Sequence, residues 1–203
     1  MTLTKLKSMP KDIIDSVFFT VFTIAAAIII CLTVRLSTVS GESMMPTFHD
    51  GDRLIISNIL YKPKRGDVVV FDGGKNSGYD NKPIIKRVIA LEGDTVKIDG
   101  GIIYVKESGS VEFTIVNYVL DMDIPLRDME DVIVPEGEAF VMGDNVNSSK
   151  DSRDPSVGTI DVESILGKVV LRFYAYETVY FEETNEYSTQ GNIVFDIKFT
   201  YEE

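Results

Sequence analysis

The chain has 203 residues, 44% of them apolar, and a formal net charge of −12 at pH 7. This length and apolar content allow one well-buried domain with appendages and exclude a wholly disordered chain. The acidic excess argues against nucleic acid as a partner, because phosphate binding needs a basic surface. Cys31 is the only cysteine, so an intramolecular disulfide is excluded as well.

An apolar run near the N-terminus predicts a membrane anchor. Residues 17–34 carry no charge, and a helix of that length spans roughly 27 Å, close to the thickness of the hydrocarbon core. Three lysines precede the run and one arginine follows it closely. The positive-inside bias therefore predicts a cytoplasmic N-terminus over residues 1–12, an anchor in the cell membrane over residues 13–35, and an extracytoplasmic remainder.

A cleaved signal peptide is the alternative for this segment. The charged start and the apolar core match one, and the three alanines at residues 25–27 resemble a small-residue cleavage site. However, the alanines lie in the middle of the run rather than after it, and the core is longer than in a typical signal peptide. We therefore favour an uncleaved, single-pass anchor.

After the anchor, the pattern changes to short β-rich runs separated by glycine and aspartate. Runs bounded by turn residues in this way predict a mostly β domain over residues 36–176. Asp99-Gly100-Gly101 predicts a hairpin turn, because glycine adopts a positive φ without steric cost. The predicted strands are residues 53–57, 67–71, 84–91, 95–98, 102–105, 113–119, 139–142 and 168–174.

Two further segments stand apart from this pattern. Residues 106–131 are less regular and predict an inserted hairpin or cap on the β domain. Residues 177–203 form an acidic extension with seven acidic side chains and one lysine, a net charge of −6. Because residues 177–183 and 192–201 alternate around a polar turn at residues 185–191, the extension predicts a terminal hairpin.

The first cluster that points to chemistry is the turn at residues 43–47, with the sequence Ser-Met-Met-Pro-Thr. A serine hydroxyl is a weak nucleophile until a base removes its proton. Gly41 permits a close approach of the backbone to a substrate, and Pro46 fixes the chain beyond Ser43. A serine in such a turn is often structural, so this cluster alone leaves both interpretations open.

The second cluster offers a base. Lys86 lies in an apolar predicted strand, and burial there disfavours the ammonium and lowers the pKa from its usual value of about 10.4. The alternative is an edge-strand lysine whose amine reaches solvent. The third cluster, residues 143–153, is a polar loop in which Asp151 and Arg153 predict an ion pair and a serine hydroxyl could orient the lysine amine. An ordinary surface turn is the alternative for this loop.

Taken in this order after an N-terminal anchor, the three clusters resemble type I signal peptidase, the membrane-bound Ser-Lys endopeptidase that removes signal peptides from exported proteins. Residues 66–71, 134–145 and 167–173 extend the resemblance, which covers about residues 13–176. It implies a signal-peptidase-like β-sheet catalytic domain, a serine peptidase without metal or cofactor. Ser43 would be the nucleophile and Lys86 the general base, with an acyl-enzyme as intermediate.

The same resemblance implies supporting roles for other residues. Ser149 corresponds to the serine whose hydroxyl orients the lysine, and Asp151 with Arg153 to the pair that supports the site. The oxyanion hole would use the backbone N–H of Ser43. Gly41 stands where some members carry a serine as a second donor, a departure typical of Gram-positive-like members.

Family substrates are exported preproteins with small residues at the first and third positions before the cut. The substrate binds as an added strand, and shallow apolar pockets supply the selectivity. By resemblance, the pocket residues are Val39, Phe48, Leu54 and Ile85. The same apolar side chains are equally suited to the core of the domain.

Two departures and three rival interpretations remain at this stage. The loop at residues 154–157 is longer than is usual in the family, and the extension beyond residue 176 has no assigned counterpart. A rival enzyme would use His49 as the base of a Ser-His-Asp triad. An assembly factor of the same fold, either a dedicated peptidase or a non-catalytic protein, would serve pilus or surface-protein biogenesis with a sortase system. The non-catalytic protein would need neither Ser43 nor Lys86. A self-cleaving repressor would need a DNA-binding region where the apolar run lies.

Overall fold

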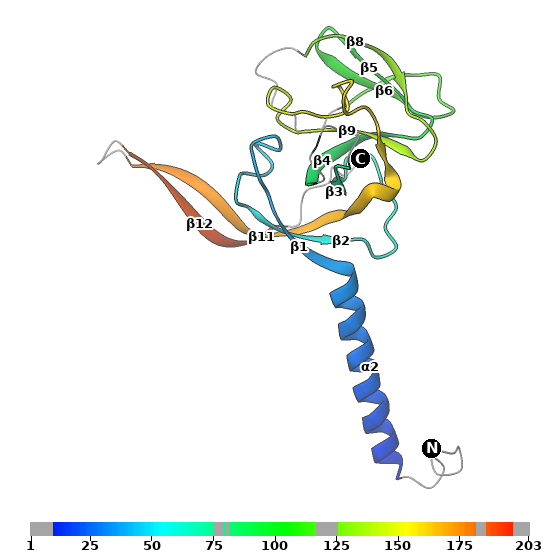
Figure 1. Ribbon diagram of the computed structural model, residues 1–203, viewed down its shortest axis with the longest axis vertical. Coiled ribbons are helices and arrows are strands. Elements are labelled where there is room, and N and C mark those ends of the chain that lie inside the picture. The colour runs from blue at the N-terminus through cyan, green and yellow to red at the C-terminus, as the bar shows by residue number, and fades with distance from the viewer. Residues whose placement is uncertain (1–9, 75–78, 80–81, 117–125, 182–185, 197–203) are drawn as a thin grey trace. The chain divides into compact units, whose positions relative to one another are not determined.

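The computed structural model of the chain describes residues 10–74, 79, 82–116, 126–181 and 186–196 (Figure 1). The chain divides into two compact units, Met1–Arg35 and Leu36–Glu203. One long helix dominates the described part of the first unit, and two β-sheets make up most of the second. The prediction of a mostly β protein with an N-terminal apolar helix is therefore confirmed.

Helix α2, Lys11–Thr33, begins directly after Pro10, where the missing N–H of proline is not needed by the helix. The hydroxyls of Thr20, Thr23 and Thr33 each donate to the carbonyl oxygen four residues earlier, at 2.7–2.9 Å. Their polar groups are thereby satisfied within the helix itself. Among the described residues, the stretch Lys11–Ile29 is the one helical segment long and apolar enough to cross a membrane by length and composition.

The larger sheet of the second unit has eight strands in the order β1-β2-β11-β3-β4-β9-β10, with β12 paired to β11. The pairings among β2, β3, β4, β9, β10, β11 and β12 are all antiparallel. Its strands are β1 (Val34–Thr38), β2 (Arg53–Ser57), β3 (Val68–Asp72), β4 (Pro83–Leu91), β9 (Glu138–Met142), β10 (Ile160–Asp161), β11 (Ile165–Phe181) and β12 (Glu186–Asp196).

Strands β3 and β4 lie in the middle of this sheet and are covered on both faces. Along β3, alternate residues point to opposite faces, so Val68 and Val70 pack in one apolar cluster while Val69 and Phe71 pack in another. Lys86 lies directly opposite Val69 in the register of β3 and β4. The apolar pattern of both strands therefore carries a lysine into the interior of the domain.

The smaller sheet has four strands in the order β7-β6-β5-β8. A third apolar cluster joins it to β4 and β9 of the larger sheet, through side chains such as Ile89, Phe140 and Ile98. Its strands are β5 (Thr95–Asp99), β6 (Ile102–Lys106), β7 (Thr114–Ile115) and β8 (Met129–Ile133), and a short 3-10 helix, η1 (Val162–Ser164), precedes β11. The described parts of residues 106–131 thus contribute strands to a sheet.

Strand β11 is the longest strand and changes partners along its length. It pairs with β3 and β2 in its first half, and then with β12 alone as far as Phe181. Figure 1 shows β11 and β12 leaving the sheet as a two-stranded ribbon. We refer to this ribbon, residues 172–181 and 186–196, as the C-terminal hairpin.

Most predicted strands match the structure to within one or two residues, but some differ. Strand β12 already begins at Glu186, so the turn predicted at residues 185–191 is wrong. Strand β7 is limited to Thr114–Ile115, and residues 117–119 of the predicted strand lie outside the described residues. Strands β1, β8 and β10 were not predicted, because each is short or rich in polar residues.

Candidate active site

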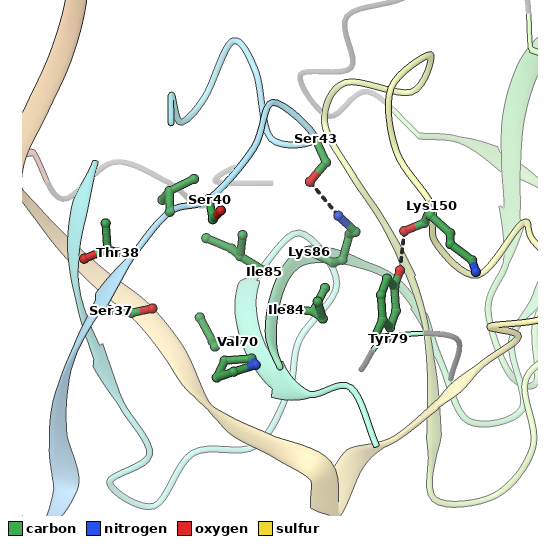
Figure 2. Close-up of a pocket in the computed structure, with 12 residues that line it drawn as sticks. Ser37, Thr38, Ser40, Ser43, Val70, Tyr79, Ile84, Ile85, Lys86 and Lys150 are labelled. Carbon is green, nitrogen blue, oxygen red and sulfur yellow. Dashed lines mark hydrogen bonds between the residues drawn. The ribbon is translucent and has the colours of Figure 1, made fainter. Parts of the chain in front are cut away.

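The structure brings Ser43 and Lys86 together, although they are 43 positions apart in the chain. Lys86 Nζ donates a hydrogen bond to Ser43 Oγ at 2.6 Å (Figure 2). Lys86 comes from β4, and Ser43 comes from the turn between β1 and β2. The pair has the contact that a base needs in order to take the proton of a serine hydroxyl.

Burial prepares Lys86 for this role. The residue is 3% exposed, and desolvation of the ammonium lowers the pKa of its amine from 10.5 to about 8. The carboxylates of Asp151 and Asp144 act in the opposite direction and raise the pKa, while the Arg153 guanidinium lowers it further. Desolvation is the largest of these effects, so a substantial fraction of the amine is neutral at mildly alkaline pH.

The turn that carries Ser43 is held at both ends. Gly41 has a φ of +88°, a conformation that favours glycine, and its N–H donates to Asp50 Oδ1 at 2.8 Å. Met44, next to the serine, is fully buried in the apolar cluster below, and its carbonyl accepts from the Phe48 N–H at 2.9 Å. The side chain of Met44 thus anchors the turn while Ser43 stays half-buried beside the lysine.

The polar loop at residues 143–153 packs against this turn. The N–H of Asn145 donates to the carbonyl oxygen of Ser43 at 3.1 Å. A Cβ added at Gly143 would collide with the Ser43 carbonyl oxygen and with the side chain of Ser149, so only glycine fits between them. The Tyr79 hydroxyl donates to the carbonyl of Lys150 and ties the segment before β4 to the same loop (Figure 2).

Ser149 lies in this loop, where the resemblance places the lysine-orienting hydroxyl. Its Oγ is buried, and it has no hydrogen-bond partner among the described residues. A buried hydroxyl without a partner is unfavourable. The structure therefore places Ser149 Oγ beside Gly143, where the Ser43 carbonyl oxygen also lies, but within the described residues it shows no hydrogen bond from this hydroxyl to Lys86.

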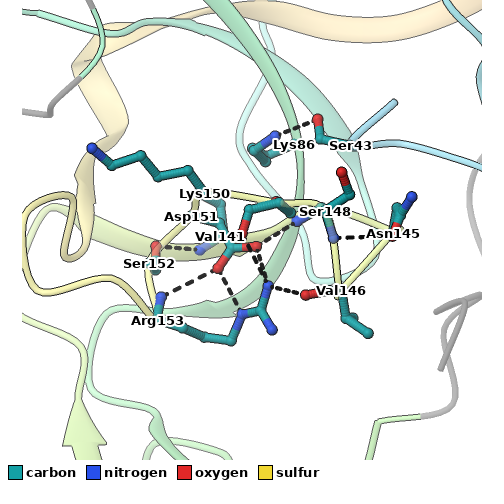
Figure 3. A network of polar contacts seen from close by, with 12 residues as sticks. Ser43, Lys86, Val141, Asn145, Val146, Ser148, Lys150, Asp151, Ser152 and Arg153 are labelled. Atoms are coloured by element: carbon teal, nitrogen blue, oxygen red, sulfur yellow. Dashed lines mark hydrogen bonds and ion pairs between the residues drawn. The ribbon is translucent and has the colours of Figure 1, made fainter. Parts of the chain in front are cut away.

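Asp151 and Arg153 form the ion pair that the sequence predicts (Figure 3). The Asp151 side chain is fully buried and accepts from Arg153 Nε and Nη2, each at 2.8 Å, and from the Gly143 N–H at 3.0 Å. Arg153 Nη2 also donates to the Val146 carbonyl at 2.8 Å. This network fixes the loop against the site without contact to Ser43.

A second ion pair, which sequence reasoning missed, lies under the site. Arg87 and Asp144 are almost completely buried and form a two-point contact, with Nε to Oδ1 at 2.7 Å and Nη2 to Oδ2 at 2.6 Å. Thr47 Oγ1 donates to the same carboxylate at 2.5 Å. Asp144 thereby connects β4, the loop after β9 and the turn at residues 43–47. The available signal was an arginine inside an apolar strand, since a buried charge requires a partner.

A groove of about 240 Å³ opens beside the dyad (Figure 2). Val39, Val70 and Ile85 supply apolar lining, together with residues of β1 and the first half of β4. Of the predicted pocket residues, Val39 and Ile85 thus line the groove. Phe48 and Leu54 are fully buried in the adjoining apolar cluster and do not line it.

The alternative base, His49, is not in position. Its backbone N–H donates to Asp52 Oδ2 at 3.1 Å, and within the described part of the chain its imidazole makes no hydrogen bond to Ser43. Nor do the described residues contain a group of three histidine, cysteine, aspartate or glutamate side chains placed to hold a metal ion. The residues present therefore support chemistry by the serine and the lysine.

Comparison with known proteins agrees with this geometry. The family profile described as signal peptidase, peptidase S26, matches residues 12–174. The chain belongs to this family. Its members are hydrolases of peptide bonds, and this chain is accordingly a serine endopeptidase of the signal peptidase type. The match ends at residue 174, so β12 lies beyond it.

Two relatives that are similar in sequence point the same way. The probable signal peptidase I-1 of Synechocystis sp. is 37% identical over 143 residues, covering 67% of this chain and 69% of the relative. Signal peptidase IB of Staphylococcus aureus is 36% identical over 155 residues, covering 68% and 77%. A crystal structure of a signal peptidase I from Enterococcus faecalis is 26% identical, with a TM-score of 0.42 over 53% of this chain and 97% of that chain.

Proposed function

We propose that this chain is a membrane-anchored signal peptidase I that cuts exported preproteins after small residues, with Ser43 as nucleophile and Lys86 as general base. The observation that carries the proposal is the 2.6 Å contact between the Lys86 amine and the Ser43 hydroxyl. Burial lowers the pKa of this amine to about 8. A non-catalytic assembly factor for pilus or surface-protein biogenesis would gain nothing from this costly arrangement.

The reaction follows from the positions of these groups. Neutral Lys86 takes the hydroxyl proton as Ser43 Oγ attacks the scissile carbonyl carbon. The Lys86 ammonium then gives that proton to the nitrogen of the peptide that leaves. The acyl-enzyme left on Ser43 is hydrolysed by a water that Lys86 deprotonates in the same way. Within the described residues the Ser43 N–H donates to no protein group, so it is free to hold the oxyanion.

The substrate fits the groove as an added strand. Residues 83–86 of β4 pair with β3 on one side only, since β9 pairs with β4 from Arg87 onward. Strand β1 is likewise at the edge of the sheet. An extended peptide laid against such edges gains backbone hydrogen bonds, and the shallow lining of Val39, Val70 and Ile85 leaves room for small side chains such as alanine.

The anchor and its orientation complete the proposal. Helix α2 would cross the cell membrane with residues 1–12 in the cytoplasm, because the lysines cluster on that side of the apolar stretch. The peptidase domain, residues 36–176, and the acidic extension, residues 177–203, would then lie on the extracytoplasmic side. This placement matches a substrate that presents its cleavage segment as it leaves the membrane.

The proposal is tested with the full chain in detergent micelles and a peptide that contains an Ala-x-Ala segment. Ser43→Ala and Lys86→Ala should each abolish cleavage while the circular dichroism spectrum stays unchanged. Ser110→Ala and Lys97→Ala remove the same groups from residues that make no contact with the dyad, and they should retain full activity. Mass spectrometry of the quenched reaction should show the acyl group on Ser43. Turnover by either dyad variant would overturn the assignment.

A further inference from the structure

Thr47 is held by two different groups, one at its side chain and one at its backbone. Its hydroxyl donates to Asp144 Oδ2 at 2.5 Å, and its carbonyl oxygen accepts from Arg172 Nη1 at 3.0 Å. Thr47 follows Ser43 by four residues in the same turn, residues 43–47, which we call the nucleophile turn. The position of the nucleophile therefore depends on both contacts, and the second comes from β11, more than a hundred residues later in the chain.

Arg172 fixes the end of the turn as well. Its Nη1 also contacts Asp52 Oδ2 at 3.1 Å, and Asp52 is fully buried and accepts from the backbone N–H of His49. The guanidinium carbon lies 5.6 Å from the centre of the Phe48 ring, a distance at which a cation is attracted to an aromatic face. One guanidinium thus touches the backbone, a ring and a carboxylate of the segment 47–52.

The other side of Arg172 is occupied by the C-terminal hairpin. Arg172 Nη2 donates to Asp196 Oδ2 at 3.0 Å, and the two residues lie opposite each other in the register of β11 and β12. Asp196 is the last described residue of β12, beyond the part of the chain that matches the family. The hairpin therefore supplies a carboxylate to a residue that holds the nucleophile turn.

We propose that the C-terminal hairpin is part of the catalytic scaffold, and that Asp196 is a positioning residue that orients Arg172 against the nucleophile turn. This inference rests on the proposed function of the Ser43–Lys86 pair and extends it to residues outside the family match. With Asp196 in place, the two ends of the guanidinium fork are bound to fixed acceptors on opposite sides. Without it, Nη2 loses this acceptor and the hydrogen bond from Nη1 to the Thr47 carbonyl is held less firmly.

The magnitude is limited by exposure. The side chains of Arg172 and Asp196 are 18% and 39% exposed, and ion pairs at such positions contribute little and are screened by salt. We therefore expect Asp196→Asn to lower kcat about two- to fivefold at low salt. KM should not change, because Arg172 is not among the residues that line the groove.

The experiment compares kcat and KM of the full chain, Asp196→Asn and Asp196→Glu at low and high salt, with the same Ala-x-Ala peptide. Asp99→Asn is the matched control, because it removes the same charge from another exposed ion pair, the 3.1 Å contact with Lys97. The ratio of wild-type to Asp196→Asn kcat should fall toward one as salt screens the pair, and Asp196→Glu should recover part of the lost rate. Asp99→Asn should follow the wild type throughout.

Two results would overturn the inference. One is a kcat for Asp196→Asn equal to that of the wild type at low salt, and the other is an equal loss in Asp99→Asn, which would reflect net charge alone. Ser43→Ala is measured in the same series to keep the proposals separate. If Ser43→Ala is inactive while Asp196→Asn is unimpaired, only the role of the hairpin fails; if Ser43→Ala remains active, the proposed function itself fails.

Discussion

The pH dependence of cleavage should report the ionisation of Lys86, because only the neutral amine accepts a proton. With a pKa of about 8, about 9% of the amine is neutral at pH 7, whereas an ordinary lysine with a pKa of 10.5 would be about 0.03% neutral. Burial thus raises the competent fraction about 300-fold at neutral pH. The value of kcat/KM should rise about tenfold per pH unit below pH 8 and level off above it.

The same ionisation should appear in the stability of the fold. The unfolded chain binds the Lys86 proton more tightly than the folded chain does, so the burial penalty is fully present below pH 8 and is relieved as the pH rises from about 8 to 10.5. The shift corresponds to about 3 kcal/mol of unfolding free energy. Lys86→Met, which removes the charge but keeps the volume, should therefore be inactive yet more stable than the wild type at pH 7.

Two measurements check this reasoning. The first is kcat/KM of the full chain between pH 6 and 10 with the Ala-x-Ala peptide. The second is urea unfolding of the wild type and Lys86→Met at pH 7 and pH 10, where the difference between them should shrink at the higher pH. A rate that is flat across this range, or one that begins to rise only near pH 10, would refute a buried and partly neutral lysine as the base.

Three further outcomes are expected. Gly143→Ala should lower kcat about 100-fold, because the added methyl group would displace the Ser43 carbonyl and with it the nucleophile; circular dichroism would show whether the fold survives. Asp144→Asn should lower the unfolding free energy in urea by about 3–5 kcal/mol, because it weakens the partner of a buried guanidinium; a loss below 1 kcal/mol would contradict that view. Incubation with EDTA should leave kcat/KM unchanged, and a loss restored by a divalent cation would show that a metal takes part.

Local pattern was sufficient for the central strands, whereas the Ser43–Lys86 pair was proposed only from the resemblance of three ordered clusters to a family. Strands β2, β3 and β4 are apolar runs between turn residues, so their burial could be predicted without knowledge of their partners. Strand β8 has the sequence Met-Glu-Asp-Val-Ile, and its two adjacent acidic residues interrupt the apolar pattern by which a strand is predicted. The turn of the C-terminal hairpin was misplaced because the polar residues 186–190 resemble a turn in composition although they pair as a strand.

The contacts that support the site could not be predicted from the sequence, for a different reason. Thr47 contacts Asp144, 97 positions away in the chain, and Arg172, 125 positions away. No sequence periodicity in these segments predicts such contacts. For Phe48 and Leu54, the sequence could not separate a place in the pocket from a place in the core. Their apolar character suits a pocket and a core equally well, and only the three-dimensional packing separates them from Val39 and Ile85, which line the groove.

The dependence of the base on burial also bears on when the enzyme becomes active. A newly made chain whose β-sheet has not yet closed exposes Lys86 to water, and there its amine is protonated and inert. In the proposed mechanism, cleavage therefore requires the completed domain. Folding itself supplies the neutral amine that would activate Ser43.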